Sequence, residues 1–146
     1  MAKQEMHRGR LIDHIQLVVK DLAASRKFYE AVGKALGIPI GGEMDGFFYI
    51  DELGITSADS PAAQGRLTGR VHLAFQAKDR AMVDAFHKAG LANGGADNGA
   101  PGERKKYHPG YYAGFLLDPD GNNIEAVYHG PHERSADSVK ISFEMP

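Results

Sequence analysis

The chain has 146 residues, of which 42% are hydrophobic, and this is enough to build one compact core. The chain has 17 lysines and arginines and 19 acidic residues, so its net charge of −2 offers no broad attraction to nucleic acid. The chain has no cysteine, which excludes disulfides and thiolate sites and leaves His, Asp and Glu as its strong metal ligands.

Residues 1–10 are polar and lack the apolar stretch of a signal peptide. No later segment has the unbroken apolar run that a membrane span requires. We therefore expect a soluble protein in the cytoplasm, with neither a membrane nor a nucleic acid as a partner.

An internal repeat organises the chain. Placing His14 over His72 shifts the sequence by 58 positions (72 − 14), and the residues after the two histidines then align without a gap. The same shift superposes residues of matching type, namely Asp21 on Asp79 and Phe28 on Phe86. The sequence therefore predicts two copies of one structural unit.

Each copy begins with a strand-like run and changes to helical spacing at an aspartate. The runs span residues 11–19 and 71–77, and Asp21 and Asp79 are the expected helix N-caps because a carboxylate can accept from the free amides of the first turn. The apolar face of each helix and the glycine expected to end it are Phe28, Val32, Leu36 and Gly37 in the first copy, and Met82, Phe86, Ala89 and Gly90 in the second.

Short strands follow each helix. We expect them at residues 47–50, 111–117 and 123–128. The last two flank Asp118-Pro119-Asp120-Gly121, which is a turn sequence because Pro presets one dihedral angle and Gly supplies a positive one. Residues 56–69, rich in Ser, Ala, Pro and Gly, are the expected connector between the copies.

Strand alternation places three candidate ligands. His14 shares a face with Gln16 and His72 shares a face with Gln76, in each case opposite the more apolar face that would pack on the helix. Glu125 is a carboxylate inside an otherwise apolar strand, so it needs a cation or hydrogen bonds.

Each of these three residues could instead be a structural polar residue that is satisfied by hydrogen bonds. Two histidines at equivalent positions of a repeat, however, are brought near each other by the pseudo-symmetry of the copies. This favours a divalent metal bound by His14, His72 and Glu125, with coordination positions left open for water or substrate.

The segments around these residues resemble the vicinal oxygen chelate superfamily, which includes glyoxalase I, extradiol dioxygenases, and the bleomycin and fosfomycin resistance proteins. The resemblance is carried by residues 12–15, 71–75 and 117–125, and the segment from Asp118 to Glu125 is its most specific part. It implies an α+β fold in which two βαβββ modules form a curved mixed sheet around a cavity, with the helices on the outer face.

In these terms, residues 1–10 are a polar N-terminal segment and residues 11–130 are a single domain. Module one covers about residues 11–60 and module two about residues 70–130, and a C-terminal extension spans 131–146. Val139, Ile141, Phe143 and Met145 alternate with polar residues and predict a strand that could cover a sheet edge or add to a partner subunit.

The resemblance implies metal-ligand roles for His14, His72 and Glu125, with Glu125 also a catalytic residue. The metal would be Fe, Mn, Ni, Co or Zn, and its chemistry electrophilic. Glyoxalase I has a further ligand, usually Glu, on the late strand of its first module. Here only Asp51 or Glu52 could serve, so the pattern is closer to the dioxygenases and the fosfomycin-modifying transferases.

The segment 93–110 combines many glycines with three consecutive cations at 104–106. It is either a lid that brings charge or a general acid/base to an anionic substrate, or a solvated surface loop. Tyr107 and His108 are the catalytic candidates in it, because they can hydrogen-bond without burying a full charge. His87 is expected on the surface of the second helix.

These features favour a metal-dependent enzyme of the lyase, isomerase, transferase or dioxygenase type that acts on a small oxygen-rich substrate. The first alternative is a non-catalytic drug- or metabolite-binding protein, such as the bleomycin resistance proteins. The second is an interaction domain that has kept an ancestral site. We expect a homodimer.

Overall fold

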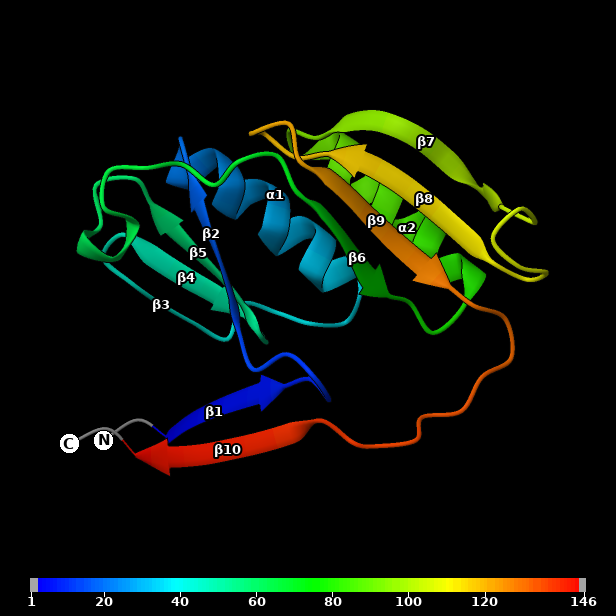
Figure 1. Cartoon of the computed structure of the whole chain (residues 1–146), viewed down its shortest axis with the longest axis horizontal. Helices are drawn as coiled ribbons and strands as arrows, with labels where there is room; N and C mark the ends of the chain where they lie inside the picture. Colours follow the sequence, from blue (N-terminus) through cyan, green and yellow to red (C-terminus); the bar gives the residue numbers. More distant parts are fainter. Residues whose placement is uncertain (1–2, 145–146) are drawn as a thin grey trace.

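The computed structural model describes residues 3–144, and for residues 3–6 and 62 it describes the backbone alone. The chain contains two copies of a strand–helix–three-strand unit (Figure 1). Module one consists of β2 (Ile15–Val19), α1 (Leu22–Ala35), β3 (Gly42–Met44), β4 (Phe47–Ile50) and β5 (Leu53–Ser57). Module two consists of β6 (His72–Gln76), α2 (Arg80–Ala92), β7 (Ala96–Glu103), β8 (Tyr112–Leu117) and β9 (Asn123–Tyr128).

The two modules have the same sheet topology. Sheet one has the strand order β2-β5-β4-β3 and sheet two the order β6-β9-β8-β7. In each, the first strand is parallel to the last strand of its module and the other neighbours are antiparallel. The predicted α+β class and the two βαβββ modules are confirmed.

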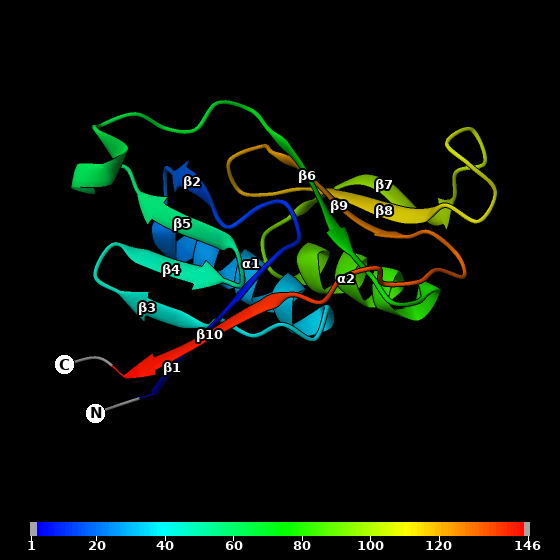
Figure 2. The same ribbon diagram turned by 60° about the horizontal axis from the view of Figure 1, so that its bottom comes forward.

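Within the described part of one chain the two sheets are separate hydrogen-bonded ladders. The strands β2 and β6 each pair with one neighbouring strand, so both are edge strands. The outer edge of β2 is occupied at Val18, whose amide donates to the hydroxyl of Thr68 at 2.7 Å and whose carbonyl oxygen accepts from the amide of Thr68 at 3.0 Å. The helices α1 and α2 contact each other, and Figures 1 and 2 show each helix against its own sheet. The faces of the sheets that point away from the helices are therefore not covered by the other module.

The helices begin where the sequence predicted. Asp21 accepts from the amide of Ala24 at 3.1 Å and Asp79 from the amide of Met82 at 2.8 Å. The first helix ends at Ala35, and Gly37 follows with φ +78°. Each cap satisfies an amide that has no partner within its helix.

The second helix differs from its prediction, because Gly90 does not end it. The helix continues to Ala92, and its buried residues are Val83, Phe86, His87 and Gly90. A Cβ on Gly90 would lie 2.2 Å from Cδ1 of Leu116, so this glycine allows the close approach of α2 to β8. His87 is buried rather than on the helix surface, and its Nε2 lies 2.9 Å from Oδ1 of Asp97.

One hydrophobic core joins both modules. Its fully buried large side chains come from both helices and both sheets: Phe28, Tyr29, Phe48, Phe86, Leu17, Ile55, Leu116 and Ile124. Burial of such side chains supplies the main driving force for folding. The assignment of residues 11–130 to a single domain remains a prediction, and the shared core supports it.

The turn 118–122 ties module two to module one. The carboxylate of Asp118 is buried, and it accepts from the backbone amides of Asp120 and Asn122 at 3.0 and 2.8 Å. Its other oxygen accepts from the hydroxyl of Tyr29 on α1 at 2.5 Å. Burial, followed by the interactions with Asp118, raises the pKa of Tyr29 well above its ordinary value.

The two ends of the described chain form a separate ribbon. β1 (Lys3–Arg8) pairs antiparallel with β10 (Val139–Glu144), and Figure 1 shows this pair lying apart from both sheets. The alternating strand after residue 138 was predicted, but β1 was not, because the first ten residues were interpreted as a polar segment. Met145 lies outside the described residues. No helix in the described part of the chain is long and apolar enough to cross a lipid bilayer.

Candidate functional site

His72 and Glu125 lie on the face of sheet two that points away from α2. On β6, Leu73 and Phe75 pack against the core, so His72 points to the opposite face. In the register of β6 and β9, Glu125 is directly opposite Ala74, two residues beyond His72. The predicted orientation of these two residues therefore holds in the structure.

The two side chains meet. Nε2 of His72 lies 3.0 Å from Oε1 of Glu125, and Nδ1 of His72 lies 3.0 Å from the carbonyl oxygen of Asn123. A carbonyl oxygen only accepts, so Nδ1 carries the ring hydrogen and donates it to Asn123. The Glu125 side chain is 3% exposed and that of His72 is 49% exposed, so the imidazole lies between a buried carboxylate and solvent.

Tyr111 completes the surroundings of Glu125, and the sequence interpretation missed it. Its hydroxyl donates a short hydrogen bond to Oε2 of Glu125. Burial, followed by this hydrogen bond, raises the pKa of Tyr111 above its ordinary value, so the phenol stays a donor. Both oxygens of Glu125 thus have a partner, one in Tyr111 and one in His72.

Strand parity could have identified Tyr111. Phe115 is directly opposite Glu125 in the register of β8 and β9, so odd-numbered residues of this segment share the face of Glu125. The next residue, Tyr112, donates its hydroxyl to Oδ1 of Asp84 on α2 at 2.6 Å. Tyr112 therefore lies on the helix side, and Tyr111 lies on the side of the site.

The predicted catalytic residues Tyr107 and His108 lie next to Tyr111 and not against Glu125. The ring of Tyr107 is 4.8 Å from that of Tyr111, and the ring of His108 is 5.4 Å from it. Nε2 of His108 lies 2.9 Å from Nδ1 of His129, and these two imidazoles are stacked. A catalytic role for Tyr107 and His108 remains a prediction.

The segment 93–110, interpreted as a lid or loop, contains a β-strand. Residues Ala96–Glu103 form β7, which pairs with β8 through an irregular, bulged register. Residues 93–95 form a turn before this strand, and the connection from Arg104 to Tyr111 after it is a loop. Its end carries Tyr107 and His108 to the rim of the site, because Tyr111 begins the return into β8.

His14 is not part of this cluster within one chain. It precedes β2, its side chain is 70% exposed, and its Nδ1 lies 2.7 Å from Oδ1 of Asp13. That hydrogen bond lowers the pKa of Asp13. Figures 1 and 2 show β2 and β6 apart, and among the side chains that the structure describes no three of His, Asp or Glu are grouped closely enough to hold a metal ion.

The candidates for a fourth ligand, Asp51 and Glu52, lie in the turn between β4 and β5. The position in module one that corresponds to Glu125 is Gly54, because Gly54 is opposite Gln16 just as Glu125 is opposite Ala74. A Cβ on Gly54 would lie 3.0 Å from Cε2 of Phe47. Module one therefore offers no carboxylate at this point of its sheet.

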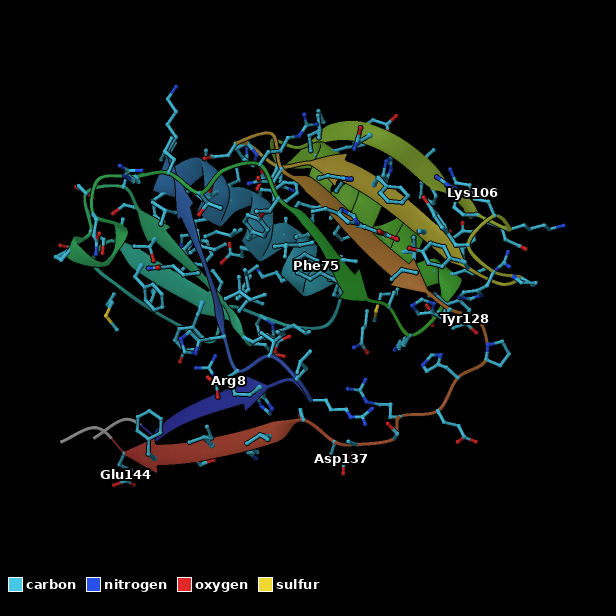
Figure 3. All side chains as sticks on the ribbon, in the orientation of Figure 1. Arg8, Phe75, Lys106, Tyr128, Asp137 and Glu144 are labelled. Carbon is cyan, nitrogen blue, oxygen red and sulfur yellow. The ribbon has the colours of Figure 1, made fainter. Side chains whose placement is uncertain are left out.

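A cleft of ≈ 670 Å³ lies elsewhere, between the C-terminal part of α1, the edge strand β6 and residues 132–138. Arg8, Phe75 and Asp137 line it, and Figure 3 labels all three. Neither His72 nor Glu125 lines this cleft. In the described part of one chain, the candidate metal ligands His72 and Glu125 and this cleft are therefore at different locations.

The pair formed by His72 and Glu125 fits a divalent metal. Metal–nitrogen and metal–oxygen bonds are about 2.0–2.2 Å long, so two ligand atoms at right angles lie about 3 Å apart. The 3.0 Å between Nε2 of His72 and Oε1 of Glu125 agrees with this spacing. The hydrogen bond from Nδ1 to Asn123 is also the support that metal-binding imidazoles usually have.

The sequence and the fold of this chain were compared with those of known proteins. A family model for the Glyoxalase/Bleomycin resistance protein/Dioxygenase superfamily matches residues 11–126. Among solved structures, a glyoxalase/bleomycin resistance protein from Albidiferax ferrireducens T118 is 34% identical, over 80% of this chain and 97% of that chain, with a TM-score of 0.68. No curated protein gives a significant match.

More distant structures share the fold. A glyoxalase/bleomycin resistance protein/dioxygenase family enzyme from Burkholderia phytofirmans PsJN is 22% identical, over 79% of this chain and 95% of that chain, with a TM-score of 0.61. A lactoylglutathione lyase from Agrobacterium tumefaciens is 21% identical, over 82% and 93%, with a TM-score of 0.57. The chain belongs to the glyoxalase, bleomycin resistance protein and dioxygenase superfamily, the vicinal oxygen chelate superfamily that its sequence resembles.

Proposed function

We propose that this protein is a metal-dependent enzyme of the glyoxalase or dioxygenase type that acts on a small oxygen-rich substrate. In this proposal, His72 and Glu125 bind a divalent metal, which is Fe, Mn, Ni, Co or Zn. When bound, the metal would supply electrophilic chemistry, because it stabilises negative charge that develops on substrate oxygens.

The observation that carries the proposal is the contact between His72 and Glu125. Since Nδ1 of His72 donates to Asn123, Nε2 is the nitrogen that faces Oε1 of Glu125, 3.0 Å away, and in a neutral imidazole this nitrogen presents a lone pair. Two acceptor atoms at that distance repel unless a cation lies between them. A proton or a metal ion can fill this role, and a divalent metal carries the larger charge.

The third ligand in this proposal is His14 of a second copy of the chain, because His14 is not grouped with His72 and Glu125 in one chain. The position of β6 at the edge of sheet two supports such a homodimer. Residues 74–78, which include the end of β6, line the cleft, so this edge is open to another strand. The uncovered face of sheet two would then meet the module that carries His14.

The chain's own residues have defined tasks in the proposed reaction. Tyr111 holds one oxygen of Glu125, so the carboxylate keeps its other oxygen directed at His72. Asn123 fixes the orientation and the tautomer of His72 through its carbonyl oxygen. Tyr107 and His108, at the rim, are the candidates for moving a proton to or from the substrate.

Metal analysis of protein purified without chelator tests the proposal. We expect about one metal ion per chain, and we expect His72→Ala and Glu125→Ala to lose it, since truncating a ligand removes a coordination bond. His132→Ala is the matched control, because Nδ1 of His132 also donates to a backbone carbonyl, that of Gly130 at 2.8 Å. Unchanged metal content in His72→Ala would refute the site.

Mixing two variants tests whether the His14 ligand comes from a second copy of the chain. His14→Ala and Glu125→Ala are combined under conditions that exchange subunits, and metal binding is compared with that of either variant alone. A site shared between two copies recovers part of its affinity in the mixture, because one of the two sites then has all three ligands. No recovery would show that the second copy does not supply His14.

A further inference from the structure

A guanidinium group lies on the same face of sheet two as the candidate metal ligands. Arg104 follows β7, and its Cζ is 5.5 Å from the ring centroid of Phe115. Phe115 is directly opposite Glu125 in the sheet, and its ring stacks on that of His72 with the centroids 6.3 Å apart. Arg104 and His72 are therefore both neighbours of one aromatic ring on the open face.

This guanidinium has no carboxylate partner among the described residues. Nη2 of Arg104 donates to the carbonyl oxygen of Ala100 at 2.7 Å, which anchors the group without neutralising it. Arg80 provides the contrast, since its guanidinium also lies over an aromatic ring, that of Tyr112 at 4.7 Å, but pairs with Glu103 at 3.2 Å. Among the described side chains, the positive charge of Arg104 beside the site is therefore not balanced by an ion pair.

The guanidinium of Arg104 lies close to the backbone of β7. A Cβ on Gly102 would lie 2.9 Å from Nη1 of Arg104, and one on Gly99 would lie 3.5 Å from Nη2. Gly99 has φ +149°, and the pairing of β7 with β8 shifts register on both sides of it. A Cβ on Gly102 would therefore crowd the guanidinium, whereas one on Gly99 would make ordinary contact with it.

The surrounding charges add to that of Arg104. Lys105 and Lys106 follow it in the loop, and Figure 3 shows Lys106 at the β7–β8 end of sheet two. The nearest acidic residue in sequence, Glu103, is held by Arg80 and by the amide of Gly110. Glu103 also interacts electrostatically with Lys105, whereas Arg104 has no carboxylate within ion-pair distance among the described side chains.

We propose that Arg104 binds an oxyanion group of the ligand that His72 and Glu125 bind through their metal. This rests on the proposed function and narrows it: the substrate carries a carboxylate or phosphate in addition to the oxygens that reach the metal. A planar, weakly hydrated guanidinium suits such a group because it donates two parallel hydrogen bonds. Phe115 forms the apolar floor between the two binding points.

Two pairs of small molecules test this proposal on Co²⁺-loaded protein kept under argon. Catechol and 3,4-dihydroxybenzoate share their vicinal oxygens and differ in one remote carboxylate, and dihydroxyacetone and its phosphate ester differ in one phosphate. Their affinities are measured by titration, with the visible spectrum of Co²⁺ as an independent report of coordination. We compare Arg104→Gln with Arg80→Gln, which removes a guanidinium from the opposite face of the same sheet.

The unaltered protein should bind the charged member of at least one pair about tenfold more tightly than the neutral member. Arg104→Gln should lose this preference while keeping Co²⁺ affinity, and Arg80→Gln should keep both. If the preference is absent from both pairs, or survives in Arg104→Gln, the role of Arg104 is refuted. Failure of the unaltered protein to bind Co²⁺ would instead refute the metal site itself.

Discussion

The two modules have the same topology but different chemistry on their open faces. In module two this face carries His72, Glu125 and Phe115, whereas Gly54 occupies the position of Glu125 in module one and Phe47 covers it. The histidines also differ, since His72 begins β6 and is held by Asn123, while His14 precedes β2 and is exposed. Duplication preserved the framework and left most coordinating groups in one copy.

The helices show where the copies must differ. Val32 of α1 and Gly90 of α2 occupy equivalent positions under the shift of 58 residues (90 − 32). A Cβ on Gly90 would lie 3.2 Å from Cγ1 of Val32, so the larger residue of one helix fills space that the smaller one leaves. Identical residues at both positions would not allow the helices to pack in this way.

We expect the largest loss of stability when Gly90 is replaced by valine, the residue at the equivalent position of α1. Gly90→Val places a branched side chain where even a Cβ would be 2.2 Å from Leu116, and we expect a loss of about 3 kcal/mol in the free energy of unfolding. Urea denaturation followed by circular dichroism measures this loss. Ala89→Val, one residue earlier and half-buried, is the control and should cost much less.

The contact between modules through Tyr29 should have the next largest effect. Tyr29→Phe removes the hydrogen bond to Asp118, and we expect a loss of about 2 kcal/mol at pH 7. Asp118 keeps its backbone donors, which limits the loss. An unfolding free energy equal to that of the unaltered protein would show that this contact contributes nothing to stability.

Tyr29 also makes a prediction about alkaline pH. Its pKa is raised in the folded state, so the folded protein holds this proton more tightly than the unfolded chain does. The resulting stability is present below the ordinary pKa of 10.0 and is lost as the pH rises above it. Denaturation at pH 8 to 11 should show a smaller alkaline loss in Tyr29→Phe.

Tyr111 and its sequence neighbour test the two faces of sheet two. Tyr111→Phe should lower metal affinity about tenfold, because Glu125 loses the donor that orients it. Tyr112→Phe removes an equivalent phenol–carboxylate hydrogen bond on the helix side and should leave metal affinity unchanged. Calorimetric titration with Co²⁺ compares the two variants, and equal affinities would remove Tyr111 from the site.

The smallest expected loss of stability comes from removing a helix N-cap, and we expect it to be equal in the two modules. Asp21→Ala and Asp79→Ala each remove a helix N-cap at equivalent positions of the repeat, and each should cost about 1 kcal/mol of unfolding free energy. Thermal and urea denaturation of the two variants measure the costs. Strongly unequal costs would show that the repeat preserved the geometry of the caps without preserving their contribution.

Much of the fold could be predicted because its signals are local. The helix starts follow from Asp21 and Asp79, and the strands at 47–50 and 123–128 follow from short apolar runs between turn residues. The end of α2 was mispredicted because Gly90 resembles a local stop signal. Its actual role depends on Leu116, which is close only in the folded protein.

Part of the candidate site could likewise be predicted from local sequence patterns, and part of it could not. Strand alternation was sufficient to place His72 and Glu125 on one face, since it depends only on position within a strand. It could not place Arg104, whose location depends on the bulged register of β7, or show that His14 lies outside the cluster. That separation depends on how the modules pack, because the helices contact each other and β2 and β6 belong to two separate sheets.

The sequence by itself determined the repeat, the α+β class, the superfamily and the shared face of His72 and Glu125, because each depends on periodicity or on motifs that are local in the chain. Tertiary structure alone decided that Tyr111 holds Glu125, that His87 is buried and that Arg104 keeps its charge beside the site without a carboxylate partner among the described residues. These depend on contacts between residues that are distant in sequence or on irregular strand pairing, and no local pattern encodes either.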